Sequence, residues 1–359
     1  MTESSTKTKT RDRKIKTLRL RVGIRRATKP KLLKCGKYQC SIQSGGKPGH
    51  ADLTMFNVDS VEHFNIPPRK RAGELWAFQT TEPQWFSAKD QYKWNGLFNY
   101  SVTYVAGTDG ARYNFADTLS KKASRTFAEF AAIKTEREAK ALWFVSHCRQ
   151  PNRKLQVTSA RDVYVQELVK YIAVDVFTRQ QNCRELFGSL IKKEDPEKPP
   201  KLNQYTFYLA FENSLCKDYI TEKLWKVLEA KSYTIPVVLG GLSIDEYKLV
   251  APPNSFIHVK NFSSPKALAD HLKHVAENDD AFNYYMQWRN EYDLRLRGTF
   301  VGMSCYYCKL AHTRPPGIWN TFSKDFGSHN CINMTASADH CPYYNLSCPS
   351  PSMSHKDLS

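Results

Sequence analysis

The chain has 359 residues, of which 41% are hydrophobic and 13% aromatic, too much apolar content for a disordered protein and enough for two domains. Its formal net charge of +18 is a feature of nucleic-acid-binding proteins. The charge is unevenly distributed, because residues 1–34 contain 13 Lys and Arg against two acids, a net +11, and the rest of the chain carries only +7. We therefore interpret residues 1–34 as a basic flexible tail, with anionic lipid or nucleic acid as its alternative partners.

Beyond this tail, short apolar runs alternate with stretches of helical periodicity. The predicted strands are 53–58, 75–80, 141–146, 173–177, 205–211, 234–239 and 256–259. The predicted helices are 160–172, 219–231, 265–277 and 281–295, and a Lys- and Glu-rich helical region covers 118–140. Strands that alternate with helices predict parallel sheets covered on both faces, which is an α/β fold.

The alternation is clearest from about 141 to 300, which favours two α/β domains, at 35–143 and 144–300. Residues 301–359 are rich in Cys, Pro, Ser and His and are predicted to form an irregular, cysteine-rich tail. The sequence contains no Asp-x-Asp motif, so it does not imply a tightly bound catalytic metal. A glycine-rich run at 44–49 has a proline after its lysine, which favours a turn over a phosphate-binding loop.

Ten cysteines are many for a cytosolic protein. Cys305-x-x-Cys308, together with Cys35 and Cys40, fits a zinc site, a redox pair or structural disulfides. The sequence also has four Asn-x-Ser/Thr sequons, at Asn99, Asn261, Asn333 and Asn345. Many cysteines and several sequons together are typical of a secretory compartment, so we favour disulfides.

The most informative stretch runs from 205 to 225. An apolar strand is followed by the polar turn Glu212-Asn213-Ser214, and a helix is then expected with Asp218 as its N-cap. A helix N-terminus beside the Lys223 ammonium suits a pyrophosphate. The same residues alone also fit an ordinary strand, turn and helix with a surface ion pair.

The string Phe-x-x-x-Phe-Glu-Asn-Ser…Asp-Tyr-Ile-Thr-Glu-Lys in this stretch closely resembles the donor-binding signature of the α1,3-fucosyltransferase family. The segments 234–240 and 255–259 also resemble that family, so the resemblance runs almost unbroken from about 141 to 292. It is thinner upstream, at 75–83 and 97–104. The family's Arg-x-Asp-Ser-Asp and Pro-Tyr-Gly segments have no counterpart after Tyr104, which leaves the acceptor side open.

The resemblance implies two Rossmann-like domains in the GT-B arrangement. It also implies inverting transfer of L-fucose from GDP-fucose to the 3-hydroxyl of an N-acetylglucosamine in a glycoprotein glycan. By position, Glu222 would bind the ribose, Lys223 and Tyr219 the phosphates, and Asn213 and Glu212 would lie near the sugar.

The segment 159–164 resembles the family's Ala-Arg-x-x-Tyr, which makes Arg161 the second cation for the phosphates. The spacer before it is longer than in the family, so Arg153 is a less favoured substitute. Glu82 matches the residue that the family uses as general base, and Glu212 is the second candidate. The resemblance implies no tightly bound cofactor and is compatible with stimulation by Mn²⁺.

The resemblance further pairs Cys35 and Cys40 with Cys305 and Cys308 in two disulfides. It implies a Golgi location, although no run of 18 apolar residues provides the usual anchor. Two alternatives remain: a protein of the same fold that binds a nucleotide sugar without activity, and a nucleic-acid-binding protein acting through residues 1–34.

Overall fold

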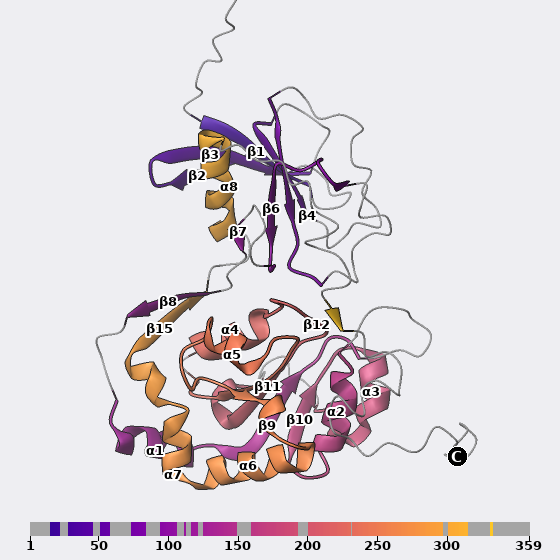
Figure 1. Ribbon diagram of the computed structural model, residues 1–359, viewed down its shortest axis with the longest axis vertical. Helices are drawn as coiled ribbons and strands as arrows, with labels where there is room; N and C mark the ends of the chain where they lie inside the picture. The colour runs from indigo at the N-terminus through magenta and orange to yellow at the C-terminus, as the bar shows by residue number, and fades with distance from the viewer. Residues whose placement is uncertain are drawn as a thin grey trace, which may run out of the picture.

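The computed structural model describes residues 15–21, 28–45, 51–57, 73–83, 94–105, 111–112, 116–120, 125–148, 159–192, 200–230, 232–296, 301–314 and 331–332. Two separate sheets dominate it (Figure 1). The predicted α/β fold with parallel sheets is confirmed.

Seven strands form the first sheet, in the order β2-β3-β1-β4-β5-β6-β7. They are β1 (Ile15–Arg21), β2 (Lys31–Cys35), β3 (Tyr38–Ser44), β4 (Leu53–Asn57), β5 (Leu75–Gln79), β6 (Tyr100–Thr103) and β7 (Ala111–Arg112). Every neighbouring pair is parallel except the antiparallel β2–β3 hairpin.

Strand β1 corrects the interpretation of residues 1–34 as a flexible tail. It lies between β3 and β4 and is parallel to both. Leu18 is fully buried, and Lys16 is also buried and forms a 3.9 Å ion pair with Asp52. The basic residues around Leu18 hide a strand whose apolar content is too sparse to reveal it. Residues 1–14 lie outside the described residues.

Five parallel strands form the second sheet, in the order β10-β9-β11-β13-β14. They are β9 (Glu138–Phe144), β10 (Val174–Phe177), β11 (Tyr205–Phe211), β13 (Ile235–Leu239) and β14 (Ile257–His258). All seven residues of the central β11 are buried, because helices cover both faces of the sheet.

The helices around the second sheet belong to two cores. One core takes buried residues from α1 (Phe127–Thr135), α2 (Arg161–Leu168), α3 (Gln181–Phe187), α6 (Pro265–Glu277) and α7 (Asp279–Tyr284). The other takes them from α4 (Glu222–Glu229) and α5 (Ile244–Lys248) and continues into the first sheet. Short 3₁₀ helices occur at Gly188–Leu190, Leu202–Gln204, Val259–Asn261 and Gln287–Asn290.

The chain crosses between the two sheets along β8 (Ala116–Ser120) and β15 (Tyr292–Leu296), which pair antiparallel. Two sequence predictions are wrong here. The predicted helix 281–295 is divided into the end of α7, a 3₁₀ turn and β15, and the helical region 118–140 contains part of β8, α1 and the start of β9.

The predicted irregular tail begins with a helix, α8 (Val301–Thr313), which packs on β1, β2 and β3. Tyr307 on this helix donates a 2.7 Å hydrogen bond to Gln79 at the end of β5. The prediction is therefore wrong for 301–314, where Cys, Ser and His residues masked the helical pattern. Further on, β12 (Leu215–Cys216) pairs with β16 (Cys331–Ile332). None of the described helices is long and apolar enough to cross a membrane.

Four disulfides are present in the described residues. Cys35–Cys305 and Cys40–Cys308 confirm the two predicted bridges. Cys148–Cys183 and Cys216–Cys331 were not predicted, and Cys341 and Cys348 lie outside the described residues. Cys40, Cys308 and His312 lie close together, but both sulfurs are used in a bridge, which leaves no thiolate for zinc.

Candidate functional site

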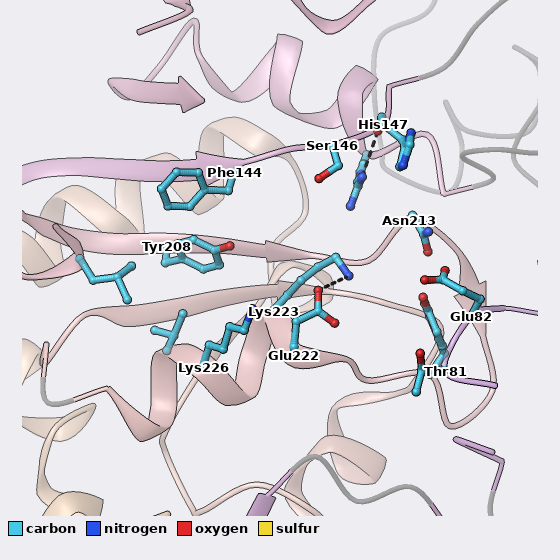
Figure 2. A pocket seen from close by; sticks show the side chains of 14 residues that line it. Thr81, Glu82, Phe144, Ser146, His147, Tyr208, Asn213, Glu222, Lys223 and Lys226 are labelled. Atoms are coloured by element: carbon cyan, nitrogen blue, oxygen red, sulfur yellow. Dashed lines mark hydrogen bonds and ion pairs between the residues drawn. The ribbon is translucent and has the colours of Figure 1, made fainter. Parts of the chain in front are cut away.

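A cavity of about 700 Å³ lies at the carboxyl ends of β5, β9 and β11, with residues of both sheets in its wall (Figure 2). The carboxyl edge of a parallel sheet is where open α/β folds bind ligands. The lining residues are Thr81, Glu82, Phe144, Ser146, His147, Arg161, Leu202, Tyr208, Asn213, Tyr219, Glu222, Lys223, Lys226 and Val227.

Six of the seven predicted site residues line this cavity, and the seventh, Glu212, lies behind its wall with 1% of its surface exposed. The carboxylate of Glu212 accepts hydrogen bonds from the Thr221 backbone N–H, at 2.7 Å, and from the Thr221 hydroxyl. It also forms a 3.0 Å ion pair with Lys223. Burial raises the pKa of Glu212, and the Lys223 ammonium opposes that rise.

The hydrogen bonds between Glu212 and Thr221 fix where α4 begins, and this start differs from the predicted one. Thr221, and not Asp218, is the N-cap residue, and the first helical residue is Glu222. Asp218 has a φ of +63°, which interrupts the helical backbone. Tyr219 therefore lies in a loop and does not share a helix face with Lys223, although both side chains reach the cavity.

Lys223 stands at the centre of a polar cluster. Its ammonium donates to the Thr221 hydroxyl at 2.7 Å and to the Glu222 carboxylate at 3.4 Å. Burial alone would raise the pKa of Glu222, but the Lys223 charge, hydrogen bonds and the Lys226 charge together outweigh it and hold that pKa below its usual value. The cavity thus presents an ammonium fixed in place beside an ionised carboxylate.

Arg161 supplies a second cation from the start of α2, and it is almost fully buried. Its guanidinium donates to the backbone oxygens of Phe211, at 2.6 Å, and His147, at 3.0 Å. Within the described residues its Nε has no partner. Arg161 therefore has the predicted position in the site, whereas Arg153 lies outside the described residues.

Asn213 and Tyr219 complete the wall where the two sheets approach each other. The buried Oδ1 of Asn213 has no hydrogen-bond partner among the described residues. The Tyr219 ring packs edge-on against Tyr104, which follows β6 of the first sheet, at 4.8 Å between centroids. Burial, reinforced by the charges of Glu82 and Glu212, raises the pKa of Tyr219 well above its usual value.

Glu82 comes from the first sheet, three residues after β5 ends. Its backbone N–H donates to the Thr80 hydroxyl at 3.1 Å, which shapes the turn that carries it. Glu82 is half-buried and lies in the cavity wall. It is the acidic residue that the first sheet contributes to this wall.

Several lining residues were not predicted. Phe144, with 37% of its surface exposed, packs with tilted rings near Phe177 and Tyr208, and Phe144 and Tyr208 form an aromatic end of the cavity. His147 lies close to Arg161, and burial together with the charge of the Arg161 guanidinium lowers the pKa of His147. The signal that identifies these residues is their position just at or after the carboxyl end of β9, in addition to their type.

The cavity therefore has two chemically different parts. One part has the cations Arg161 and Lys223, and the other has the aromatic rings of Phe144 and Tyr208. Two cations suit a pyrophosphate, and a flat aromatic surface suits a nucleobase. The arrangement fits a nucleoside diphosphate.

Comparison with known proteins points to a single family. Residues 134–320 match the family described as glycosyltransferase family 10 (fucosyltransferase) C-term. The chain is 35% identical over 285 residues to the human 3-galactosyl-N-acetylglucosaminide 4-alpha-L-fucosyltransferase FUT3, an alignment that covers 76% of this chain and 70% of that protein. It is 33% identical over 226 residues to glycoprotein 3-alpha-L-fucosyltransferase A of Drosophila melanogaster, covering 62% of this chain.

The chain spans only 39% of the length of that Drosophila relative and 46% of the alpha-(1,3)-fucosyltransferase fut-1 of Caenorhabditis elegans, to which it is 32% identical. A crystal structure of an alpha1,3-fucosyltransferase with GDP-fucose aligns with a TM-score of 0.45 at 16% identity, covering 78% of this chain and 83% of that one. The extent of the family match and the identity to the human protein establish that the chain belongs to glycosyltransferase family 10, the fucosyltransferases.

Proposed function

We propose that this chain transfers L-fucose from GDP-fucose to the 3-hydroxyl of an N-acetylglucosamine in a glycoprotein glycan, with inversion at the anomeric carbon. One observation carries the proposal. A single cavity combines a carboxylate from the first sheet, Glu82, with the cations Arg161 and Lys223 from the second. This is the set of groups that a displacement at the sugar carbon of a nucleotide sugar requires.

In the proposed complex the donor lies along the cavity with its diphosphate at Arg161 and Lys223. Tyr219 adds a hydroxyl to the phosphates, and Glu222 accepts hydrogen bonds from the ribose. The guanine lies at the aromatic end, between Phe144 and Tyr208. The unpartnered Oδ1 of Asn213 then accepts a hydrogen bond from a hydroxyl of the fucose.

Glu82 acts as the general base in this mechanism. It removes the proton of the acceptor hydroxyl as the hydroxyl oxygen attacks the anomeric carbon, and the bond from that carbon to the diphosphate breaks. The negative charge that develops on GDP is stabilised by Arg161 and Lys223, which are already fixed by their contacts. A positioned base contributes roughly 10²–10⁴-fold to the rate.

Glu212 has a positioning role in this proposal. Its carboxylate already accepts hydrogen bonds from the backbone N–H and the hydroxyl of Thr221 and pairs with Lys223, and it does not line the cavity. With these partners and outside the cavity wall, the Glu212 carboxylate cannot reach an acceptor hydroxyl. We therefore prefer Glu82 as the base.

We further propose that the two sheets correspond to two Rossmann-like domains in the GT-B arrangement, the first for the acceptor and the second for the donor. The predicted bounds of 35–143 and 144–300 need correction, because β1 and α8 belong with the first sheet, and α1 and all of β9 belong with the second. A Golgi location is proposed from the family and is in keeping with four disulfides. Stimulation by Mn²⁺ stays a prediction, tested by assaying transfer with and without a chelator.

The test is fucose transfer from GDP-fucose to a panel of terminal lactosamine and N-glycan-core acceptors. The wild type is compared with Glu82→Gln and with Glu185→Gln, which changes an exposed glutamate on α3 in the same way. We expect transfer by the wild type and the control, and a loss of about 10²–10⁴-fold in kcat with unchanged GDP affinity in Glu82→Gln.

The panel also identifies the acceptor, since only the matching glycan is fucosylated. A folded wild-type protein that binds GDP but transfers fucose to no acceptor would contradict the proposal and favour the binding-only alternative. Full activity of Glu82→Gln would leave the reaction in place and exclude Glu82 as its base.

A further inference from the structure

The loop that joins β11 to α4, residues 212–221, forms part of the cavity wall. It carries Asn213 and Tyr219, and it leads directly into Glu222 and Lys223. Most of it is neither helix nor strand, and Asp218 within it has a φ of +63°. A loop of this kind keeps a fixed shape only if its surroundings hold it. We call residues 212–221 the β11–α4 loop.

A segment from far along the chain holds the middle of this loop. Leu215 and Cys216 pair antiparallel with Ile332 and Cys331, and the Cys216–Cys331 disulfide joins the two strands. Figure 1 shows this small β12–β16 pair at the end of the second sheet that is nearer to the first. Leu215 and Cys216 are both fully buried or nearly so.

The partner of this bridge is not part of the family match, which ends at residue 320. Cys331 therefore lies outside the segment that the family match covers. The three other disulfides connect segments outside the β11–α4 loop.

The loop is also supported by close packing. A Cβ atom placed on Gly241, just after β13, would overlap the backbone of Cys216. At the far end of the loop, Tyr219 packs on Tyr104, and Thr221 is bonded to Glu212. The contacts of Glu212, Tyr219 and Thr221 fix the two ends of the loop. The disulfide therefore restricts the residues between these ends.

We propose that Cys331 is a positioning residue, which through its disulfide to Cys216 holds the β11–α4 loop in the shape that binds the nucleotide. The inference rests on the proposed function for the identity of the ligand, GDP-fucose. Neither sulfur touches the cavity, so the bridge acts by reducing the number of loop conformations in the unbound protein.

The first test compares the full-length wild type with the Cys216→Ala/Cys331→Ala variant. The matched control is Cys35→Ala/Cys305→Ala, which removes a bridge on the first sheet while Cys40–Cys308 still joins the same segments. Two quantities are measured, the Kd for GDP and the hydrogen-exchange rate of the amides in 215–223.

We expect the Kd for GDP and the KM for GDP-fucose to rise about tenfold in the Cys216/Cys331 variant, with kcat at saturating donor changed by less than about threefold. Amide exchange in 215–223 should become faster, in particular at Thr221, whose N–H donates to Glu212. The control should keep the wild-type values of both quantities. A role in general stability alone would not produce this split between KM and kcat.

Equal GDP affinity and equal exchange in the variant and the wild type would overturn the proposal. If the wild type binds no GDP and amide exchange is still faster in the variant, the proposed function is wrong, but the disulfide does restrict the loop. If the double variant does not fold, Gly241→Ala gives a second test. It presses on the Cys216 backbone and should weaken GDP binding, and unchanged binding would count against the proposal.

Discussion

At the scale of single residues, the site is organised by a carboxylate that does not enter the cavity. Glu212 orients Lys223 and fixes the first residue of α4 through Thr221. This buried glutamate gains enough from its partners to offset part of the cost of burying a charge. Removing one partner from such a cluster leaves the others unsatisfied, so the two glutamates, Glu82 and Glu212, should respond differently to substitution.

We predict that Glu212→Ala lowers the free energy of unfolding by about 3 kcal/mol, because it leaves Lys223 and the Thr221 N–H without their buried acceptor. Glu212→Gln should cost less, since its amide oxygen still accepts from Thr221. Both folded variants should keep the acidic limb of the pH dependence of kcat/KM, whereas Glu82→Gln should lose it. Urea unfolding and pH–rate profiles measure these effects. A lost acidic limb in Glu212→Gln would instead identify Glu212 as the base.

The two sequons within the described residues have different surroundings. The Asn99 side chain accepts a 3.0 Å hydrogen bond from the Trp76 backbone N–H, and Ser101 is fully buried. Asn261 and Ser263 are both exposed. We predict that protein secreted from eukaryotic cells carries an N-glycan on Asn261 and none on Asn99, as measured by mass spectrometry of glycopeptides. Glycosylated Asn99, or unmodified Asn261, would contradict this.

At the scale of elements, the sequence predicted best those segments whose local signals agree with their tertiary environment. Strand β11 has its predicted bounds because it is apolar throughout and buried on both faces. Helix α6 also has its predicted bounds, with Ser264 as N-cap and Pro265 in the first turn. Strand β1 was missed because its burial depends on two neighbouring strands that local sequence does not reveal.

The candidate site also has some features that could be predicted from the sequence and others that could not. The predicted binding residues came from the family resemblance, since the residue pattern alone also fits a plain strand and helix. What neither revealed is where α4 begins, because that depends on Thr221 meeting Glu212 across the loop. The Cys216–Cys331 bridge was also out of reach, since its cysteines are 115 residues apart and spacing does not determine pairing.

The short edge strand β14 contains a fully buried histidine, His258, whose ring packs edge-on against Tyr247. Burial, reinforced by the Lys260 charge, lowers the pKa of His258 to about 4. Between this value and the usual value near 6.5, the unfolded chain binds more protons than the folded one. The contribution of neutral His258 to the free energy of unfolding is therefore fully present above about pH 6.5, and it is lost as the pH falls towards 4.

We predict that His258 accounts for a loss of about 2 kcal/mol in the free energy of unfolding between pH 7 and pH 5. His258→Asn should reduce this pH dependence, although it also lowers stability at neutral pH. His274→Asn, on the exposed side of α6, should leave the dependence unchanged. Urea unfolding at a series of pH values measures both. An unaltered slope in His258→Asn would show that other groups cause it.

At the scale of the whole molecule, the first sheet is closed by segments from the two ends of the described chain. Helix α8 packs on β1, β2 and β3, and two disulfides join it to β2 and β3. The sequence separations of the two bridges are 270 and 268 residues, and their cysteines are close to each other in sequence at both ends. When either one is intact, the other closes only a small additional ring. The two bridges should therefore be strongly coupled in their effect on stability.

We predict that replacing either pair, Cys35/Cys305 or Cys40/Cys308, by alanine lowers the free energy of unfolding by about 3 kcal/mol, because only the small ring opens. Replacing both pairs should cost about 8 kcal/mol, since the last substitution also releases the long loop. The excess over the sum of the single effects is measured by urea unfolding as a double-mutant cycle. Removing Cys148–Cys183, which lies in the second sheet's core, should instead be additive with either bridge. If the two long bridges also prove additive, loop closure in the unfolded chain is not their main contribution, and their effect must come from local packing around Cys40 and Cys308, both fully buried in the folded protein.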